Sequence, residues 1–214
     1  MNRKNLRSLA AGVALLLAVG ALAGCGGEKK ADDSKKMVTV GIAQLVEHGA
    51  LDAANKGFVA GMASKGFKEN ENVKYDRQNA QADQSNLQNI AQRFVSNKVD
   101  LICAIATPTA QTMANATKDI PIVATAVTDY EVAKLAASNN EPKGNVTGTS
   151  DMNPIDQQLE LLLKIAPQTK NIGTVYSSSE VNSQLQAELL KKYAAEKGVQ
   201  VEEATVSNVN DIQQ

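Results

Sequence analysis

Residues 101–126 read LICAIATPTAQTMANATKDIPIVATA, which is two short apolar runs on either side of a helical segment. The first run, 101–105, is followed at once by Thr107-Pro108-Thr109, and proline suits the first turn of a helix. The second run, 120–126, is again apolar and short. A strand, a helix and a strand in this order predict a parallel βαβ unit whose strands are buried on both faces.

The same alternation continues on both sides of this unit. Apolar runs predict further strands at 37–43, 73–77, 146–149, 171–176 and 199–205. Helical spacing of apolar residues predicts helices at 51–67, 87–97, 132–137, 155–165 and 180–197, with one more opening at 208. Gly57 and Gly61 predict that the first of these helices packs closely on the sheet. The whole series is typical of a doubly wound α/β fold with parallel sheets.

The N-terminus reads as a bacterial lipoprotein signal. Three basic residues precede an apolar stretch, 9–23, that is too short for a comfortable membrane span. The stretch ends in Leu22-Ala23-Gly24-Cys25, a lipobox in which Cys25 becomes the first mature residue and carries the lipid. More than one acyl chain, palmitate among them, gives stable anchoring. The alternative is a general secretory signal with a chance cysteine.

Composition and patterning together predict four segments. These are a lipoprotein signal peptide at 1–24, a lipidated flexible tether at 25–36, an N-terminal α/β lobe at 37–148 and an incomplete second α/β lobe at 149–214. The Gly-, Asn- and Thr-rich segment 143–152 is the candidate hinge between the lobes. We expect an exported protein, lipid-anchored to the outer face of the cytoplasmic membrane, and a chain that continues in a longer protein.

Several function classes are disfavoured by composition. The chain of 214 residues has 22 basic and 23 acidic side chains and no basic block, which argues against nucleic acid as a partner. Two cysteines exclude a disulfide scaffold, and Cys103, within an apolar run, is expected to be a buried inert thiol. The sequence contains no phosphate-binding glycine loop and no nucleophile elbow, so we expect no catalytic residue and no cofactor.

Polar segments follow four predicted strands, where ligands bind in open parallel sheets. The segments are 43–48, 106–109, 127–130 and 177–182. Hydroxyl groups and backbone N–H groups at helix starts favour a carboxylate, whereas Glu47 and Asp129 favour an ammonium group. Both features in one site would suit an amino acid.

A simpler interpretation exists for most of these residues. Thr107, Thr109, Asp129 and Ser179 are also good helix caps, each contributing roughly 1 kcal/mol. Glu47 and His48 fit a solvated loop, and a single histidine is a weak metal ligand, so no metal site is expected. Position favours the binding interpretation, because all four segments belong to the same end of the strands, and capping does not require Gln44 or Asn182.

At these segments the sequence resembles the ABC transporter substrate-binding lipoproteins of the tryptophan/tyrosine-type branch. The resemblance covers essentially all of 37–214, and its most specific block is GNVTGTSD at 144–151. It is also carried by EHGALD at 47–52 with GF at 57–58, ATPTAQ at 106–111, DIPI at 119–122, YSSSE at 176–180 and NS at 182–183.

The resemblance implies a type I periplasmic-binding-protein fold, in which two α/β lobes joined by a hinge close on a small ligand. It implies delivery of the ligand, an aromatic or other amino acid, to a membrane permease driven by an ATPase, without a reaction. The residues that match the family's binding loops are Gln44, Glu47, Thr107, Thr109, Thr128, Asp129, Ser178, Ser179, Glu180 and Asn182. Gly49 and Tyr130 stand where the family would have proline. The alternatives are a binding lipoprotein for a sugar or nucleobase, and a ligand-sensing lipoprotein that partners a receptor kinase.

Overall fold

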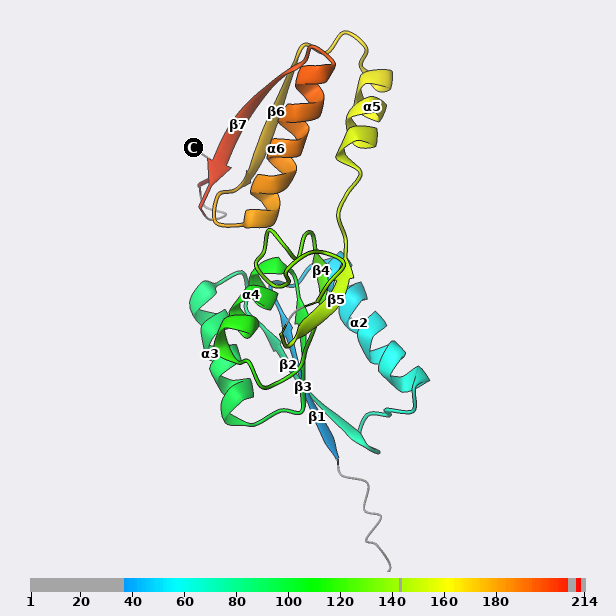
Figure 1. Ribbon diagram of the computed structural model, residues 1–214, viewed down its shortest axis with the longest axis vertical. Coiled ribbons are helices and arrows are strands. Elements are labelled where there is room, and N and C mark those ends of the chain that lie inside the picture. Colours follow the sequence, from blue (N-terminus) through cyan, green and yellow to red (C-terminus); the bar gives the residue numbers. More distant parts are fainter. Residues whose placement is uncertain (1–36, 143, 208–210, 213–214) are drawn as a thin grey trace, which may run out of the picture. The chain divides into compact units, whose positions relative to one another are not determined.

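The computed structural model describes residues 37–142, 144–207 and 211–212 (Figure 1). The predicted signal peptide, the tether and the start of the helix expected at 208 lie outside the described residues. The elements are β1 (Val38–Gln44), α2 (Gly49–Ser64), β2 (Val73–Asn79), α3 (Gln84–Ser96), β3 (Leu101–Ile105), α4 (Thr107–Ala116), β4 (Ile122–Val127), β5 (Val146–Ser150), α5 (Ile155–Ile165), β6 (Asn171–Ser177), α6 (Val181–Glu196) and β7 (Gln200–Val206). The predicted α/β fold with parallel strands is confirmed.

Five strands form one parallel sheet in the order β2-β1-β3-β4-β5. The central strands β1 and β3 are almost fully buried, as their unbroken apolar sequences require. Because every strand runs in the same direction, the carboxyl ends of β1, β3 and β4 meet at one edge of the sheet. Gln44 pairs with Ile105, and Ile105 pairs with Thr125, so these ends lie side by side.

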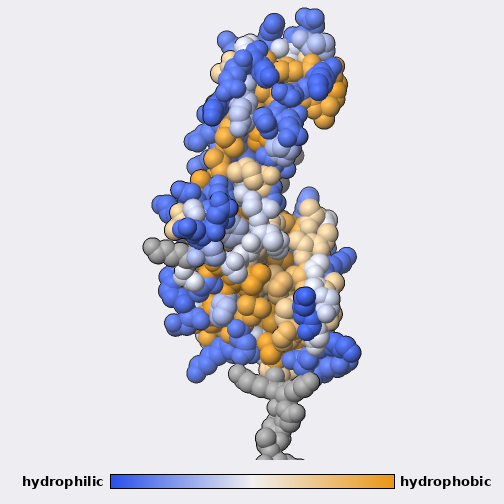
Figure 2. Space-filling model, turned by 45° about the vertical axis from the view of Figure 1, so that its right-hand side comes forward, coloured by the Kyte–Doolittle hydropathy of each residue, from blue (hydrophilic) through white to orange (hydrophobic). Residues whose placement is uncertain are grey.

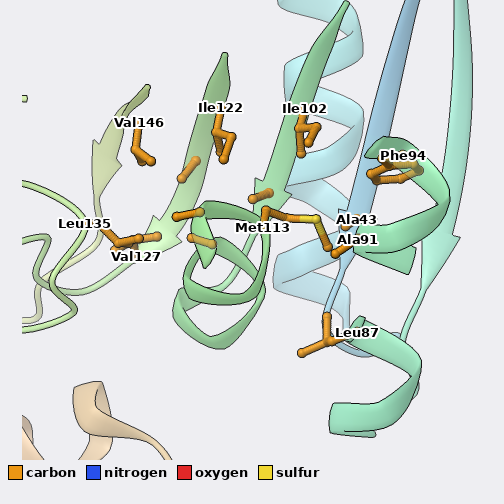
Figure 3. Close-up of a cluster of buried hydrophobic side chains, with 14 of the residues drawn as sticks. Ala43, Leu87, Ala91, Phe94, Ile102, Met113, Ile122, Val127, Leu135 and Val146 are labelled. Carbon is orange, nitrogen blue, oxygen red and sulfur yellow. The ribbon is translucent and has the colours of Figure 1, made fainter. Parts of the chain in front are cut away.

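Helices cover the two faces of this sheet unequally. α3 and α4 pack on one face, where Phe94 and Met113 meet the side chains of Ile102 and Ile122 (Figure 3). Gly41 makes this packing possible, because a Cβ there would lie 2.7 Å from the Phe94 ring. On the other face, α2 alone packs over a second cluster of buried residues from β1, β2 and β3.

Residues 151–207 contain a smaller parallel sheet, β6-β7, with the helices α5 and α6. Its core is small and centres on Leu159, Ala194 and Val199. Ile165 is 76% exposed and Val175 is 63% exposed, and Figure 2 shows hydrophobic residues at the surface of both parts of the described chain. Within the described residues, no helix has the length and apolarity needed to cross a membrane.

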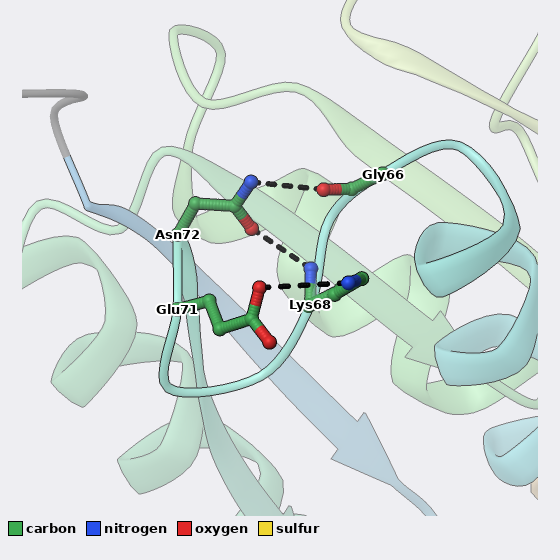
Figure 4. Close-up of polar contacts among 4 residues, drawn as sticks. All are labelled: Gly66, Lys68, Glu71 and Asn72. Atoms are coloured by element: carbon green, nitrogen blue, oxygen red, sulfur yellow. Dashed lines mark hydrogen bonds and ion pairs between the residues drawn. The ribbon is translucent and has the colours of Figure 1, made fainter.

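Side-chain hydrogen bonds to the backbone stabilise the start of α3 and the turn between α2 and β2. Asp83 accepts from Asn86 N at 2.8 Å and caps the start of α3. Between α2 and β2, the Asn72 side chain accepts from Lys68 N and donates to Gly66 O, each at 2.8 Å (Figure 4). The neighbouring Lys68–Glu71 ion pair is more than half exposed on both sides and adds little to stability.

Two predictions about elements are wrong. Residues 132–137, predicted as a short helix, form turns and bends instead. There, Asp129 accepts from Val132 N and Asn139 Nδ2, both at 2.8 Å, which fixes a compact loop. Gly57 and Gly61 are exposed, and a Cβ at either position would meet nothing within 4 Å, so neither glycine mediates close packing on the sheet.

Candidate ligand-binding site

The start of α4 is the most distinctive part of the candidate site. Its N-cap residue, Ala106, has φ 89°, a conformation that is unfavourable for a residue with a side chain, and it makes no side-chain cap. Pro108 has no N–H, and the N–H groups of Thr107 and Thr109, in the first turn, have no carbonyl partner within the helix. Strain of this kind is held at functional sites more often than elsewhere.

Two threonine hydroxyls lie at this helix start, and only one has a partner within the described residues. Thr107 Oγ1 accepts from Thr128 N at 3.5 Å, which joins the ends of β3 and β4. Thr109 is fully buried, and its Oγ1 has no hydrogen-bond partner within the described chain. An unpaired buried hydroxyl lowers stability, by about 1–3 kcal/mol, so Thr109 is costly unless something binds it. The positive end of the helix dipole favours an anionic group here.

Gln44 lies at the same edge of the sheet, but its side chain is hydrogen-bonded to other residues of the protein. Its Nε2 donates to Asp52 Oδ1 at 2.6 Å and to Val46 O at 2.9 Å. Its Oε1 accepts from Asn55 Nδ2 at 3.2 Å. Gln44 therefore ties the end of β1 to the first turns of α2 and positions Asp52 and Asn55 beside the sheet edge.

Asp52 and Asn55 are two polar residues of this edge that the sequence analysis did not select. They are half-buried rather than exposed, unlike the polar residues on a solvated helix face. A signal was available, because both sit in the first turns of a helix that follows a predicted binding loop. Their contact with Gln44 depends on the fold and is not visible in the local sequence.

Glu47 and His48 lie in the exposed loop before α2. His48 Nδ1 accepts from Ala50 N at 3.3 Å and caps α2. Thr128 is buried at the end of β4, and its carbonyl accepts from Ser150 Oγ at 2.7 Å. Asp129 belongs to the loop described above, with both carboxylate oxygens hydrogen-bonded. Of these residues, Thr128 contacts the start of α4 through Thr107, whereas the side chains of His48 and Asp129 are hydrogen-bonded to their own loops.

The binding residues predicted for a second lobe lie between the carboxyl end of β6 and the start of α6. Ser178 and Ser179 are exposed, and Ser179 Oγ lies 2.9 Å from Ser177 Oγ. Asn182 Nδ2 donates to Glu180 Oε2 at 3.3 Å, whereas Asn182 Oδ1 is buried without a partner in the described chain. α6, like α4, has no side-chain cap. An unpartnered buried oxygen thus occurs at the starts of α4 and α6, two of the three helices without a side-chain cap in the described chain.

The hydroxyl of Tyr176, in β6, is hydrogen-bonded to another side chain. Its OH donates to Glu203 Oε1 at 3.1 Å, and Lys191 lies 2.8 Å from the other oxygen of that carboxylate. Hydrogen bonding from Lys191 lowers the pKa of Glu203, so this carboxylate stays ionised. Tyr176 lines an apolar cavity of about 340 Å³ between α5, α6 and β6, which Ser183 also lines but Ser178 and Ser179 do not. In the described part of the chain, no three His, Cys, Asp or Glu residues cluster as metal ligands.

Comparison with known proteins gives one family and several relatives. A family model described as ABC transporter substrate binding protein matches residues 39–214. The tyrosine-binding protein of Clostridioides difficile strain R20291 is 47% identical over 221 residues, which cover 100% of this chain and 63% of that protein.

Two solved structures are similar in sequence and in fold. The ABC domain in complex with L-Trp from Streptococcus pneumoniae is 43% identical, with a TM-score of 0.80. The ligand-free, open structure of a substrate binding protein with adhesive properties from Clostridium difficile is 49% identical, with a TM-score of 0.63. In each case the match covers 83% of this chain and 60% of the other. The chain thus spans less than two thirds of the length of these relatives.

Proposed function

The chain belongs to the family of ABC transporter substrate-binding proteins, and from this premise we propose that it captures an amino acid for import. The proposed ligand is an aromatic amino acid, since one relative is a tyrosine-binding protein and another was solved with L-Trp. The proposed partners are a membrane permease and its ATPase. Binding is proposed without any reaction on the ligand, so the protein is not an enzyme.

The observation that carries this proposal is the unpartnered Thr109 hydroxyl at the start of α4. A ligand carboxylate placed there would accept from Thr109 Oγ1 and from the free N–H groups of the first turn. A hydrogen bond from a neutral hydroxyl to a charged carboxylate is stronger than a hydrogen bond between two neutral groups. The half-buried carboxylate of Asp52, held by Gln44, is a candidate partner for the ligand ammonium group.

We also propose that residues 37–148 and 149–214 belong to two lobes that close on the ligand. β5 continues to Ser150, so the hinge would begin after the end of this strand. Asn182, with its unpartnered Oδ1, is the proposed contact from the second lobe. Ligand contacts from both lobes would stabilise the closed form and shift the population toward it.

Export and lipid anchoring are proposals that rest on residues 1–25. The proposed mature protein begins at Cys25, carries acyl chains there and stands on the outer face of the cytoplasmic membrane. Mass spectrometry of the protein from membranes tests this directly, because an unmodified Cys25 or an uncleaved leader would contradict it.

The ligand proposal is tested with the full-length protein without its lipid, by thermal shift and calorimetry against amino acids, a hexose and a nucleobase. A ligand at about 100 times its dissociation constant adds about 2.7 kcal/mol of stability. We expect L-tryptophan or L-tyrosine to raise the melting temperature by several degrees. A shift with the hexose or nucleobase alone would contradict the amino-acid proposal and leave the family assignment intact.

Thr109→Val and Thr112→Val form a matched pair for locating the ligand. Thr109→Val removes a hydroxyl that has no partner among the described residues, so we expect unchanged or higher stability and about tenfold to hundredfold weaker binding. Thr112 lies on the same helix, but its hydroxyl donates to Pro108 O at 2.9 Å. Thr112→Val should therefore lower stability and leave binding unchanged. Equal affinity of both variants for the amino acid would remove α4 from the proposed site.

A further inference from the structure

β5 is the strand from which the chain leaves the five-stranded sheet. Within the described residues it is an edge strand, and only its first residue, Val146, is buried. Beyond Ser150 the chain runs without regular structure through 151–154 to α5. An exposed edge strand has few packing contacts to hold it, so its position depends on contacts with β4.

The pairing of β4 with β5 is interrupted close to this exit. Ala124 pairs with Gly148 and Val127 pairs with Ser150, with a register shift between Ala124 and Val127. Ala126, inside the shift, has φ 55°, as expected for an irregular strand position. Thr149 thus lies opposite the bulge, where regular pairing is lost.

Tyr130 bridges the two strands at this interruption. Its hydroxyl donates to Ala124 O of β4 at 3.0 Å and reaches Thr149 O of β5 at 3.2 Å. One proton serves two carbonyl oxygens, one on each strand. The side chain is only 6% exposed, so solvent competes little for this contact.

The glycine opposite makes the bridge possible. A Cβ at Gly148 would lie 1.9 Å from Ala124 O and 2.2 Å from the Tyr130 hydroxyl. Only a residue without a side chain lets the strands and the phenol approach in this way. We call Tyr130, Ala124, Gly148 and Thr149 the β4–β5 clamp.

The loop that carries Tyr130 is itself held by hydrogen bonds. Tyr130 N donates to Asn139 Oδ1 at 2.7 Å, and Tyr130 O accepts from Leu135 N at 2.8 Å. Two further bonds close the exit, since Ser150 Oγ donates to Thr128 O at 2.7 Å and Asp151 N donates to Val127 O at 3.1 Å. The end of β5 is therefore hydrogen-bonded both to Tyr130 in the loop and to the end of β4.

We propose that Tyr130 is a positioning residue for ligand capture, which fixes the point where the chain leaves β5 and thereby strengthens binding without touching the ligand. The inference rests on the proposed function. If the exit point is loose, lobe closure must also order it, and the entropy lost on ordering weakens the apparent affinity. If the exit point is already fixed, closure does not carry this penalty.

Tyr130→Phe in the full-length protein is the test, because it removes the hydroxyl and keeps the ring. Tyr75→Phe is the matched control, since Tyr75 is 7% exposed and its hydroxyl has no partner within the described chain. The probe is L-tryptophan, titrated at 25 °C, where both variants must be folded. Hydrogen exchange of the Asp151 amide reports on the clamp without any ligand.

We expect Tyr130→Phe to weaken binding about threefold to tenfold, the effect of one hydrogen bond, and to accelerate Asp151 exchange by a similar factor. Tyr75→Phe should change neither quantity. Faster exchange with unchanged affinity would overturn the positioning proposal, because the clamp would then serve stability alone. Unchanged exchange would overturn the clamp itself. If the wild-type protein binds no amino acid, the proposed function is wrong, and so is the proposal that Tyr130 strengthens binding. Hydrogen exchange of the Asp151 amide then still tests whether the Tyr130 hydroxyl holds β5 against β4.

Discussion

A methyl group at Gly148 would lie 1.9 Å from the carbonyl oxygen of Ala124, which is backbone and has little room to move. We expect Gly148→Ala to lower the free energy of unfolding by about 2–3 kcal/mol, as overpacking does elsewhere. Urea denaturation measures the change. Gly173→Ala is the control, because Gly173 is also in a strand and a Cβ there meets nothing within 4 Å. Gly148→Ala as stable as Gly173→Ala would contradict the packing seen around β5.

Single residues at the candidate site show the limit of sequence reasoning at this scale. The residue types at Thr107 and Thr109 point correctly to a helix start, and the sequence alone places them after β3. Whether a side chain is free is decided by contacts made across the fold. Gln44 is bound by Asp52 and Asn55, and no local pattern distinguishes it from the unpartnered Thr109.

At the scale of elements, α2 offers a stability prediction. Gly57 and Gly61 are exposed positions in the interior of α2, where glycine is less favourable than alanine by about 0.5–1 kcal/mol. Gly57→Ala and Gly61→Ala should each raise the melting temperature by a few degrees, measured by circular dichroism. Gly66→Ala is the contrasting variant, since φ +90° at Gly66 disfavours a side chain and stability should fall. A loss of stability at Gly57 would indicate a contact on that face of α2.

The elements themselves were largely predictable because buried parallel strands read as apolar runs. All strands of both sheets lie at the predicted runs, and a helix lies between consecutive strands except between β4 and β5. The turns at 132–137 were not predictable from the apolar spacing of this segment. Its turns depend on the Asp129–Asn139 contact, which spans ten positions, and a periodicity argument does not contain it. Tyr130 was likewise recognisable as unusual, but its bridge to β5 depends on the sheet.

At the scale of the whole molecule, buried acids of the five-stranded part predict how stability depends on alkaline pH. Burial raises the pKa of the Cys103 thiol from 9.0 to about 12. Burial, with a smaller effect of Asp151, raises the pKa of the Tyr130 hydroxyl from 10.0 to about 12. Burial also raises the pKa of Tyr75. In each case the folded protein favours the neutral form more strongly than the unfolded chain does.

The sign of the pH effect follows from which state releases its protons first. Above about pH 9 the unfolded chain loses the thiol proton, and above about pH 10 the tyrosine protons, while the folded protein keeps them. The free energy of unfolding should therefore be insensitive to these groups below pH 9 and fall as pH rises to about 12. Urea denaturation at a series of pH values measures the decline.

Tyr130→Phe and Cys103→Ala separate the contributions by their pH windows. Tyr130→Phe should make the decline shallower only above about pH 10, whereas Cys103→Ala should make it shallower from about pH 9. Each variant also loses packing or a hydrogen bond, which shifts the curve at every pH without changing its slope. Comparing slopes thus isolates the titrating group from the structural change. A Tyr130→Phe curve parallel to the wild-type curve from pH 10 to pH 12 would show that the Tyr130 hydroxyl ionises as readily in the folded protein as in the unfolded chain. That result would contradict the burial of the Tyr130 hydroxyl in the β4–β5 clamp.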